Sequence, residues 1–204
     1  MAESLTQQLF AQLQGAPMQQ MSSQLGIGEQ QTSQAVSAAL PLLMGALGRN
    51  ASQPQGAQAL LGALQKDHGG SGDNIASLLG SVLGGAGGRQ TDGAGILGHI
   101  LGGNQGRAEA GLAQVAGLDA NKAGQLMKVL APLVMAFLAR QTQQGSADPQ
   151  ALGALLGQEQ QQISQSGGAA DLLGAVLDQD GDGKLGVGDL LKIGGSLFGK
   201  RCDE

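Results

Sequence analysis

The chain has 204 residues, a formal net charge of −5 and 37 glycines, but no Trp, no Tyr and only three Phe. This composition excludes nucleic-acid binders that stack bases on aromatic rings or follow phosphates with basic residues, and one cysteine excludes a disulfide framework. The hydrophobic share of 41% is too high for ordinary disorder, so we expect a folded chain with few groups for chemistry.

Neither a targeting signal nor a membrane span is predicted. Residues 1–8 carry no basic region and no apolar run, so we expect no secretory signal and a cytoplasmic location. The longest apolar stretch, residues 126–139, contains Lys128 and Pro132 and is shorter than the about 20 residues that a bilayer span needs. We therefore interpret this stretch as a buried core helix and expect no membrane association.

Apolar residues recur at helical spacing from the N-terminus onward, which predicts an all-α fold class. No stretch shows the β-branched alternation of strands. A short helix is expected near the N-terminus, and two longer stripes each contain a proline, Pro41 or Pro132, predicting a kinked or two-part helix. The apolar positions are Leu5, Leu9 and Leu13, then Val36, Leu40, Leu43 and Leu47, then Met127, Ala131, Val134 and Leu138.

The two stripes belong to an internal repeat. When Pro41 is aligned with Pro132, residues 22–64 and 113–158 match as two related helical units, with Arg49 meeting Arg140 and one four-residue insertion. Leu and Gly are so frequent in this chain that some of their matches are expected by chance. Matches of Pro and Arg at the same alignment are not expected by chance. The sequence therefore predicts an internal duplication over residues 1–165.

A Gly-rich connector, residues 68–106, separates the two units. It contains the pattern Leu-Leu-Gly-Ser-Val-Leu at 78–83, which recurs in related form at 60–64, 96–101 and 172–177. This pattern predicts short helices that end at glycine, and we interpret the central glycine as permitting close approach of another helix. Asp73 and Asp92 precede two of these helices and are predicted to cap them.

Three segments carry a resemblance to a known family. Residues 93–103, 130–135 and 39–42 resemble the YidB-like family of bacterial proteins, a domain of unknown function, over roughly residues 1–165. The resemblance implies a helical, bacterial protein. It implies no activity and no catalytic residues.

One chemical motif stands out, at residues 178–189, and it resembles the EF-hand calcium loop. Loop positions 1, 3 and 5 are carboxylates that can converge on one hard cation, position 6 is a glycine at the sharp turn, and position 7 offers its backbone carbonyl. Position 8 is the apolar Leu185. Position 9 is Gly186, which has no side-chain ligand, so a water is expected to coordinate the ion there. The predicted metal-ligating residues are Asp178, Asp180, Asp182, Lys184 and Asp189.

Apolar segments flank this loop, at 169–177 and 189–198, so we expect an EF-hand-like module over 169–199, followed by a tail at 200–204. Position 12 is Asp189, where a bidentate Glu is usual. The shorter side chain leaves weak Ca²⁺ binding or Mg²⁺ binding as alternatives. Since the motif occurs once, the loop is expected to pack on the helical units or on another copy of the chain.

The sequence therefore favours a non-enzymatic, divalent-cation-binding helical protein with an interaction or structural role. Its expected partner is another protein or a second copy of the chain. An alternative is a homo-oligomerising helical scaffold in which the ion is only structural, and a second alternative is an enzyme with its site in a helical cleft. We identify no catalytic residues and no small-molecule substrate, because His68 and His99 stand isolated in the sequence.

Overall fold

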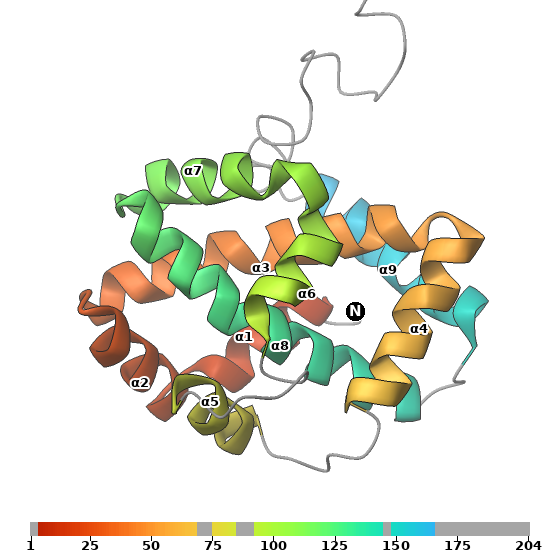
Figure 1. Cartoon of the computed structure of the whole chain (residues 1–204), viewed down its shortest axis with the longest axis horizontal. Coiled ribbons are helices and arrows are strands. Elements are labelled where there is room, and N and C mark those ends of the chain that lie inside the picture. The colour runs from red at the N-terminus through yellow and green to blue at the C-terminus, as the bar shows by residue number, and fades with distance from the viewer. Residues whose placement is uncertain (1–3, 69–74, 85–91, 145–147, 166–204) are drawn as a thin grey trace, which may run out of the picture.

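The computed structural model describes residues 4–68, 75–84, 92–144 and 148–165, and over these residues it is all-α without a strand. Within these residues, ten helical segments follow one another (Figure 1). In chain order they are α1 (Leu5–Leu13), α2 (Ala16–Leu25), α3 (Glu29–Ala51), α4 (Pro54–His68), α5 (Ile75–Leu83), α6 (Gly93–Leu101), the short 3₁₀ turn η1 (Gly102–Asn104), α7 (Gln105–Ala116), α8 (Ala120–Gln144) and α9 (Pro149–Gln165).

The two longest helices, α3 and α8, contact each other at the centre of the fold. Both apolar stripes that the periodicity predicts are buried there, from Val36 to Leu47 and from Met127 to Leu138. Pro41 and Pro132 lie inside these helices, and each helix continues on both sides of its proline. The two-part helix is therefore wrong. An interior proline costs about 3 kcal/mol, which the burial of the surrounding stripe outweighs.

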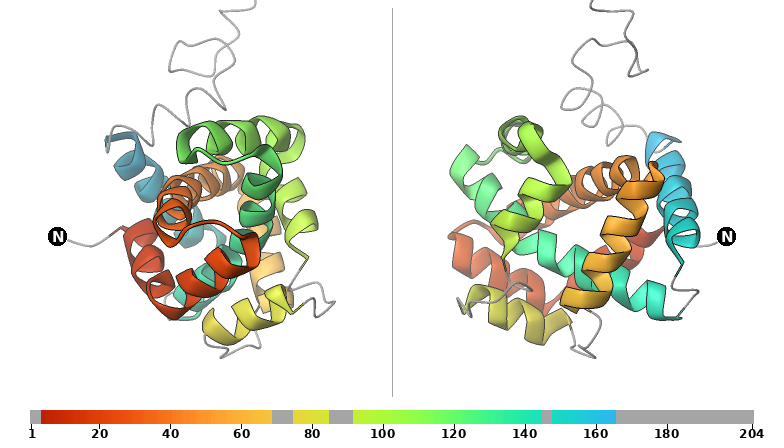
Figure 2. Two further views of the ribbon diagram at one scale, coloured as in Figure 1. Left: turned by 90° about the vertical axis from the view of Figure 1, so that its left-hand side faces the viewer. Right: turned by 45° about the vertical axis from the view of Figure 1, so that its right-hand side comes forward.

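The shorter helices cover this central pair (Figures 1 and 2). Helices α1, α2, α4, α6, α7 and α9 contact α3, while α2, α4, α5, α6 and α7 contact α8. By length and composition α8 is the one helix among the described residues that could cross a membrane, but 72% of its apolar window is buried inside the fold. That burial identifies α8 as a core helix, as the sequence predicts for residues 126–139.

Helices α1–α4 and α6–α9 follow the same order, with two short helices, a long proline-containing helix and a helix that begins at proline. The turns after α2 and α7 are closed in the same way. Gly26 and Gly117 end these helices in the left-handed conformation, with φ of 60° and 62°, where L side chains are disfavoured. The next residues, Ile27 and Leu118, donate their N–H groups to the carbonyls of Ser22 and Ala113.

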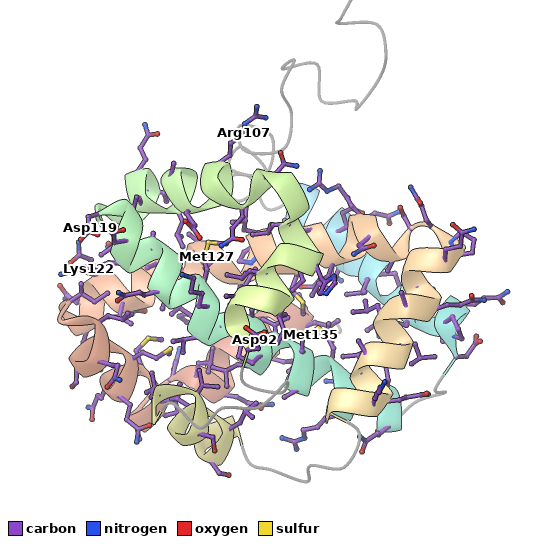
Figure 3. All side chains as sticks on the ribbon, viewed as in Figure 1. Asp92, Arg107, Asp119, Lys122, Met127 and Met135 are labelled. Carbon is purple, nitrogen blue, oxygen red and sulfur yellow. The ribbon has the colours of Figure 1, made fainter. Side chains whose placement is uncertain are left out.

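The two sets of helices also contact each other reciprocally. Gln31 at the start of α3 donates its Nε2 to the Gly117 carbonyl after α7, at 2.7 Å. Lys122, at the equivalent position of α8, donates its Nζ to the Gly26 carbonyl after α2, at 3.2 Å (Figure 3). The start of each long helix thus caps the end of a short helix in the opposite set.

These reciprocal caps should contribute unequally to stability. We expect Gln31→Ala to lower the free energy of unfolding by about 1 kcal/mol, because two carbonyls of the α7 end lose their donor. Lys122→Ala should lower it by about 0.5 kcal/mol, since its bond is solvent-exposed. Urea unfolding measures both, with exposed Gln30→Ala as the control. Equal midpoints for all three variants and the parent would contradict the assignment.

In the described copies of the repeated apolar pattern, the central glycines do not mediate helix contacts, so that interpretation is wrong for them. Gly62, Gly80 and Gly98 are exposed, and a Cβ on any of them would have no neighbour within 4 Å. The apolar pair before each glycine faces the core, and the helical turn then places the glycine outside. Close approach occurs instead at Gly93, where a Cβ would overlap the Lys128 carbonyl oxygen. The predicted glycine ends are confirmed, since α5 and α6 stop immediately before a glycine.

Candidate functional site

The predicted cation loop lies outside the described residues. This applies to each of its ligand positions, so the metal site stays a prediction. The predicted ligand positions are Asp178, Asp180, Asp182, Lys184 and Asp189.

Within the described residues, no group of three or more His, Cys, Asp or Glu side chains is placed to hold a metal ion. Three aspartates instead cap helix N-termini. Asp92 accepts from Gly95 N at 3.0 Å, as the sequence predicts, while Asp119 and Asp148 accept from backbone N–H groups at 2.9 and 3.2 Å. Their carboxylates stabilise the helix dipoles, which accounts for their positions without a ligand.

A buried carboxylate joins the two ends of the described fold. Glu159 of α9 is 3% exposed and accepts hydrogen bonds from the N–H groups of Leu5 and Thr6, at 2.8 and 2.9 Å. The Thr6 hydroxyl donates to the same carboxylate. The first turn of α1 thus receives its anionic partner from α9, and these donors compensate the desolvation of the charge.

Sequence reasoning missed this contact. Glu159 lies in the Gln-rich run at 158–162, which is typical of a solvated helix face. An acid in such a run gives no signal of burial, because its partners are more than 150 residues away. The contact depends on the tertiary fold alone.

A cavity of about 430 Å³ lies between α3, α4, α6 and α8. Its wall is mainly aliphatic, and the Asn50 amide of α3 donates to the His99 carbonyl of α6 at 3.4 Å. No carboxylate, hydroxyl or thiol lies among the lining residues, so His99 has no acid–base partner in the wall. Met135 lines the cavity from α8 (Figure 3). The lining residues are Leu47, Asn50, Gly56, Ala59, Leu60, Ala63, Ile96, His99, Ile100 and Met135.

Two further hollows are more polar. One, of about 560 Å³, lies where the α3–α4 junction meets the start of α9 and includes Asp148. The other, of about 550 Å³, lies between α2 and α5, where the Gln24 amide donates to the Leu83 carbonyl at 3.1 Å. Neither brings together side chains that form a catalytic pair.

The two arginines that match in the internal repeat differ in environment. Arg140 is exposed, whereas Arg49 is partly buried, and its Nε is fully enclosed with no hydrogen-bond partner. Desolvation lowers the pKa of the Arg49 guanidinium from its ordinary value. The sequence match therefore does not extend to equivalent surroundings.

Taken together, the helices define an all-α domain in which two four-helix sets interlock around α3 and α8. Residues 7–141 match a family described as "Bacterial protein of unknown function (DUF937)", and the chain belongs to that family. No curated protein and no solved structure matches the chain. The family description agrees with the bacterial origin that the resemblance implies, and it assigns no activity.

Proposed function

We propose that this chain is a non-enzymatic, divalent-cation-binding helical protein with an interaction or structural role, and that residues 178–189 bind Ca²⁺ or Mg²⁺. The main observation in support of this proposal is the loop pattern, with aspartates at positions 1, 3 and 5, glycine at 6 and an acid at 12. Without a cation these clustered carboxylates would repel one another. The proposal includes a cytoplasmic location and a partner that is another protein or a second copy.

The use of acids elsewhere in the chain supports this assignment. Asp92, Asp119, Asp148 and Glu159 each accept hydrogen bonds from backbone N–H groups at helix N-termini. The loop acids follow a different pattern, because they recur at the alternate positions from which an EF-hand supplies its ligands.

Calorimetric titration tests the cation site directly. Ca²⁺ or Mg²⁺ added to the full chain should bind at about one site per chain. The double variant Asp178→Ala/Asp182→Ala should abolish the binding heat, since two of the converging carboxylates are lost. Asp171→Ala, just before the loop, is the matched control and should bind as the parent does. A parent chain that binds neither cation would overturn the proposal.

Position 12 offers a gain-of-function test. A longer side chain can reach the ion with both carboxylate oxygens, so Asp189→Glu should tighten Ca²⁺ binding on the order of tenfold. Mg²⁺, which takes fewer protein ligands, should gain less. Competition titrations of the two ions on parent and variant measure the difference. Unchanged Ca²⁺ affinity would place Asp189 outside the coordination sphere.

A homo-oligomerising scaffold with a structural ion is the alternative function. The reciprocal contacts of Gln31 and Lys122 favour it, because surfaces that pair within one chain have the symmetry needed to pair between copies. Light scattering with Ca²⁺ and with chelator separates the two functions. A cation-responsive interaction protein changes its association state, whereas a scaffold keeps it. An enzymatic function has no comparable support, since His99 has no acid–base partner in its cavity.

We also propose that the two helical sets arose by duplication, with units near residues 22–64 and 113–158. The matched capping turns at Gly26 and Gly117 support this origin. So do Pro41 and Pro132, which occupy the same place in α3 and α8. The YidB-like resemblance belongs to the same proposal.

A further inference from the structure

The cavity between α3, α4, α6 and α8 has an apolar floor and a polar rim. Helices α4 and α6 both cross α8, and the cavity lies between them (Figure 1). Asn50 and His99 are exposed on its rim, whereas the floor is buried. The volume of about 430 Å³ falls within the range of about 300–1,000 Å³ that is typical of small-molecule sites. The floor consists of Leu47, Leu60, Ile100 and Met135, each less than one-tenth exposed.

The shape and wall of this cavity favour a hydrocarbon chain over a flat ring. Its lining residues on α4 run from Gly56 to Ala63, which corresponds to roughly 10 Å along the helix at 1.5 Å per residue. No Phe lines the wall, so an aromatic ligand would find no ring to stack on except the imidazole of His99. Met135 on the floor is a flexible side chain that can adapt to a flexible ligand.

The equivalent place in the fold, where α8 and α9 meet α1, is bridged by polar side chains. Gln141 of α8 corresponds to Asn50 of α3, and Gln8 of α1 corresponds to Ile96 of α6 when these two helices are aligned at their N-caps. The Gln141 amide donates to Gln8 Oε1 at 3.2 Å. A glutamine pair thus lies where the wall of the cavity carries Asn50 and Ile96. The apolar cavity is therefore a property of its own side chains and does not follow from the helix arrangement alone.

The rim suits an anionic head group. The imidazole of His99 carries an N–H donor in either tautomer, and the Asn50 amide holds the rim together by donating to the His99 carbonyl at 3.4 Å. Because no acidic side chain lines the cavity, a carboxylate beside His99 meets a donor and no like charge. A charged head group also stays in contact with water there, since His99 is exposed.

We propose that this cavity binds an unbranched aliphatic carboxylate of medium chain length. The hydrocarbon chain lies against the buried floor, and the carboxylate lies at the rim beside His99. The wall holds no catalytic pair, so the ligand is bound and not converted. This site needs no cation and adds a small-molecule ligand to the proposed function.

Calorimetric titration of the full chain with decanoate tests the proposal, in the presence of chelator so that the cation loop does not contribute. The parent should bind about one decanoate per chain. Ala63→Phe fills the cavity from α4 and should weaken binding on the order of a hundredfold, because each buried methylene group is worth about fourfold in affinity. Ala154→Phe places the same ring on the exposed side of α9, outside the cavity lining, and should bind as the parent does. Circular dichroism verifies that every variant keeps its helices.

The head group is tested separately. His99→Ala removes the rim donor and should weaken decanoate binding about tenfold, since a hydrogen bond to a charged group is lost. Binding of decan-1-ol, whose head group is uncharged, should weaken less than that of decanoate in the same variant. Titration of 2-naphthoate, which carries a carboxylate on a flat ring, should give weaker binding than decanoate to the parent.

Each outcome decides the proposal. A parent chain that binds no decanoate would overturn it, as would an Ala63→Phe variant that binds decanoate as tightly as the parent. Tighter binding of 2-naphthoate than of decanoate would overturn the assignment of an aliphatic chain, and unchanged decanoate affinity of His99→Ala would overturn the position of the head group. Decanoate binding in a chain that shows no calorimetric cation binding would support the ligand site while contradicting the proposed function.

Discussion

Glu159→Ala should lower the free energy of unfolding by about 3 kcal/mol, a large part of the stability of a domain of this size. The substitution removes the acceptor of the Leu5 and Thr6 N–H groups and of the Thr6 hydroxyl. The buried Leu5 N–H group then keeps no partner, because the first turn of a helix has no internal acceptor. Urea unfolding measures the loss, and hydrogen exchange should show the first turn of α1 losing protection before the rest.

Two variants calibrate this result. Glu159→Gln keeps one acceptor oxygen and loses the charge, so its loss should fall between those of the parent and Glu159→Ala. Glu109→Ala removes a carboxylate that accepts one bond within α7, from Gln105, and should cost about 0.5 kcal/mol. If Glu159→Ala costs no more than Glu109→Ala, the carboxylate does not hold α1.

Gly93→Ala and Gly98→Ala should change stability in opposite directions, although both lie in α6. A Cβ at Gly93 would overlap the Lys128 carbonyl oxygen, so α6 must move away from α8, at a cost of about 3 kcal/mol. At Gly98 a Cβ meets no atom within 4 Å, and alanine should stabilise the helix by about 1 kcal/mol.

The opposite signs make this pair its own control. Thermal and urea unfolding of both single variants measure the effect, and the double variant should fall near the sum if Gly98 is free of tertiary contacts. Two stabilised variants would mean that α6 does not approach α8 closely. Two destabilised variants would mean that the exposed side of α6 is covered.

The sequence predicts the elements whose signal is local. The stripe from Val36 to Leu47 repeats over several turns, so its helix and its buried side are both visible in the sequence, and both are confirmed. The Asp92 cap is equally local, because its acceptor bonds the N–H of a residue three positions ahead. The cation loop is also a local pattern, which is why it can be proposed apart from the fold.

Contacts between distant segments could not be predicted in this way. The burial of Glu159 depends on the first turn of α1, and nothing near Glu159 distinguishes it from a solvated acid. The central glycines are the converse case, because a small residue alone does not indicate on which side of its helix it lies. The buried pair Leu78 and Leu79 fixes that side and turns Gly80 outward.

The interlocking of the two sets also determines the order in which the protein can fold. The start of α1 pairs with Glu159, 154 positions later in the chain, so α1 completes its contacts only after α9 has been synthesised. Helical proteins usually fold fast because their contacts are local. Here the long loop closures should slow folding and leave the apolar stripe of α3 without its partners until α8 and α9 have been synthesised.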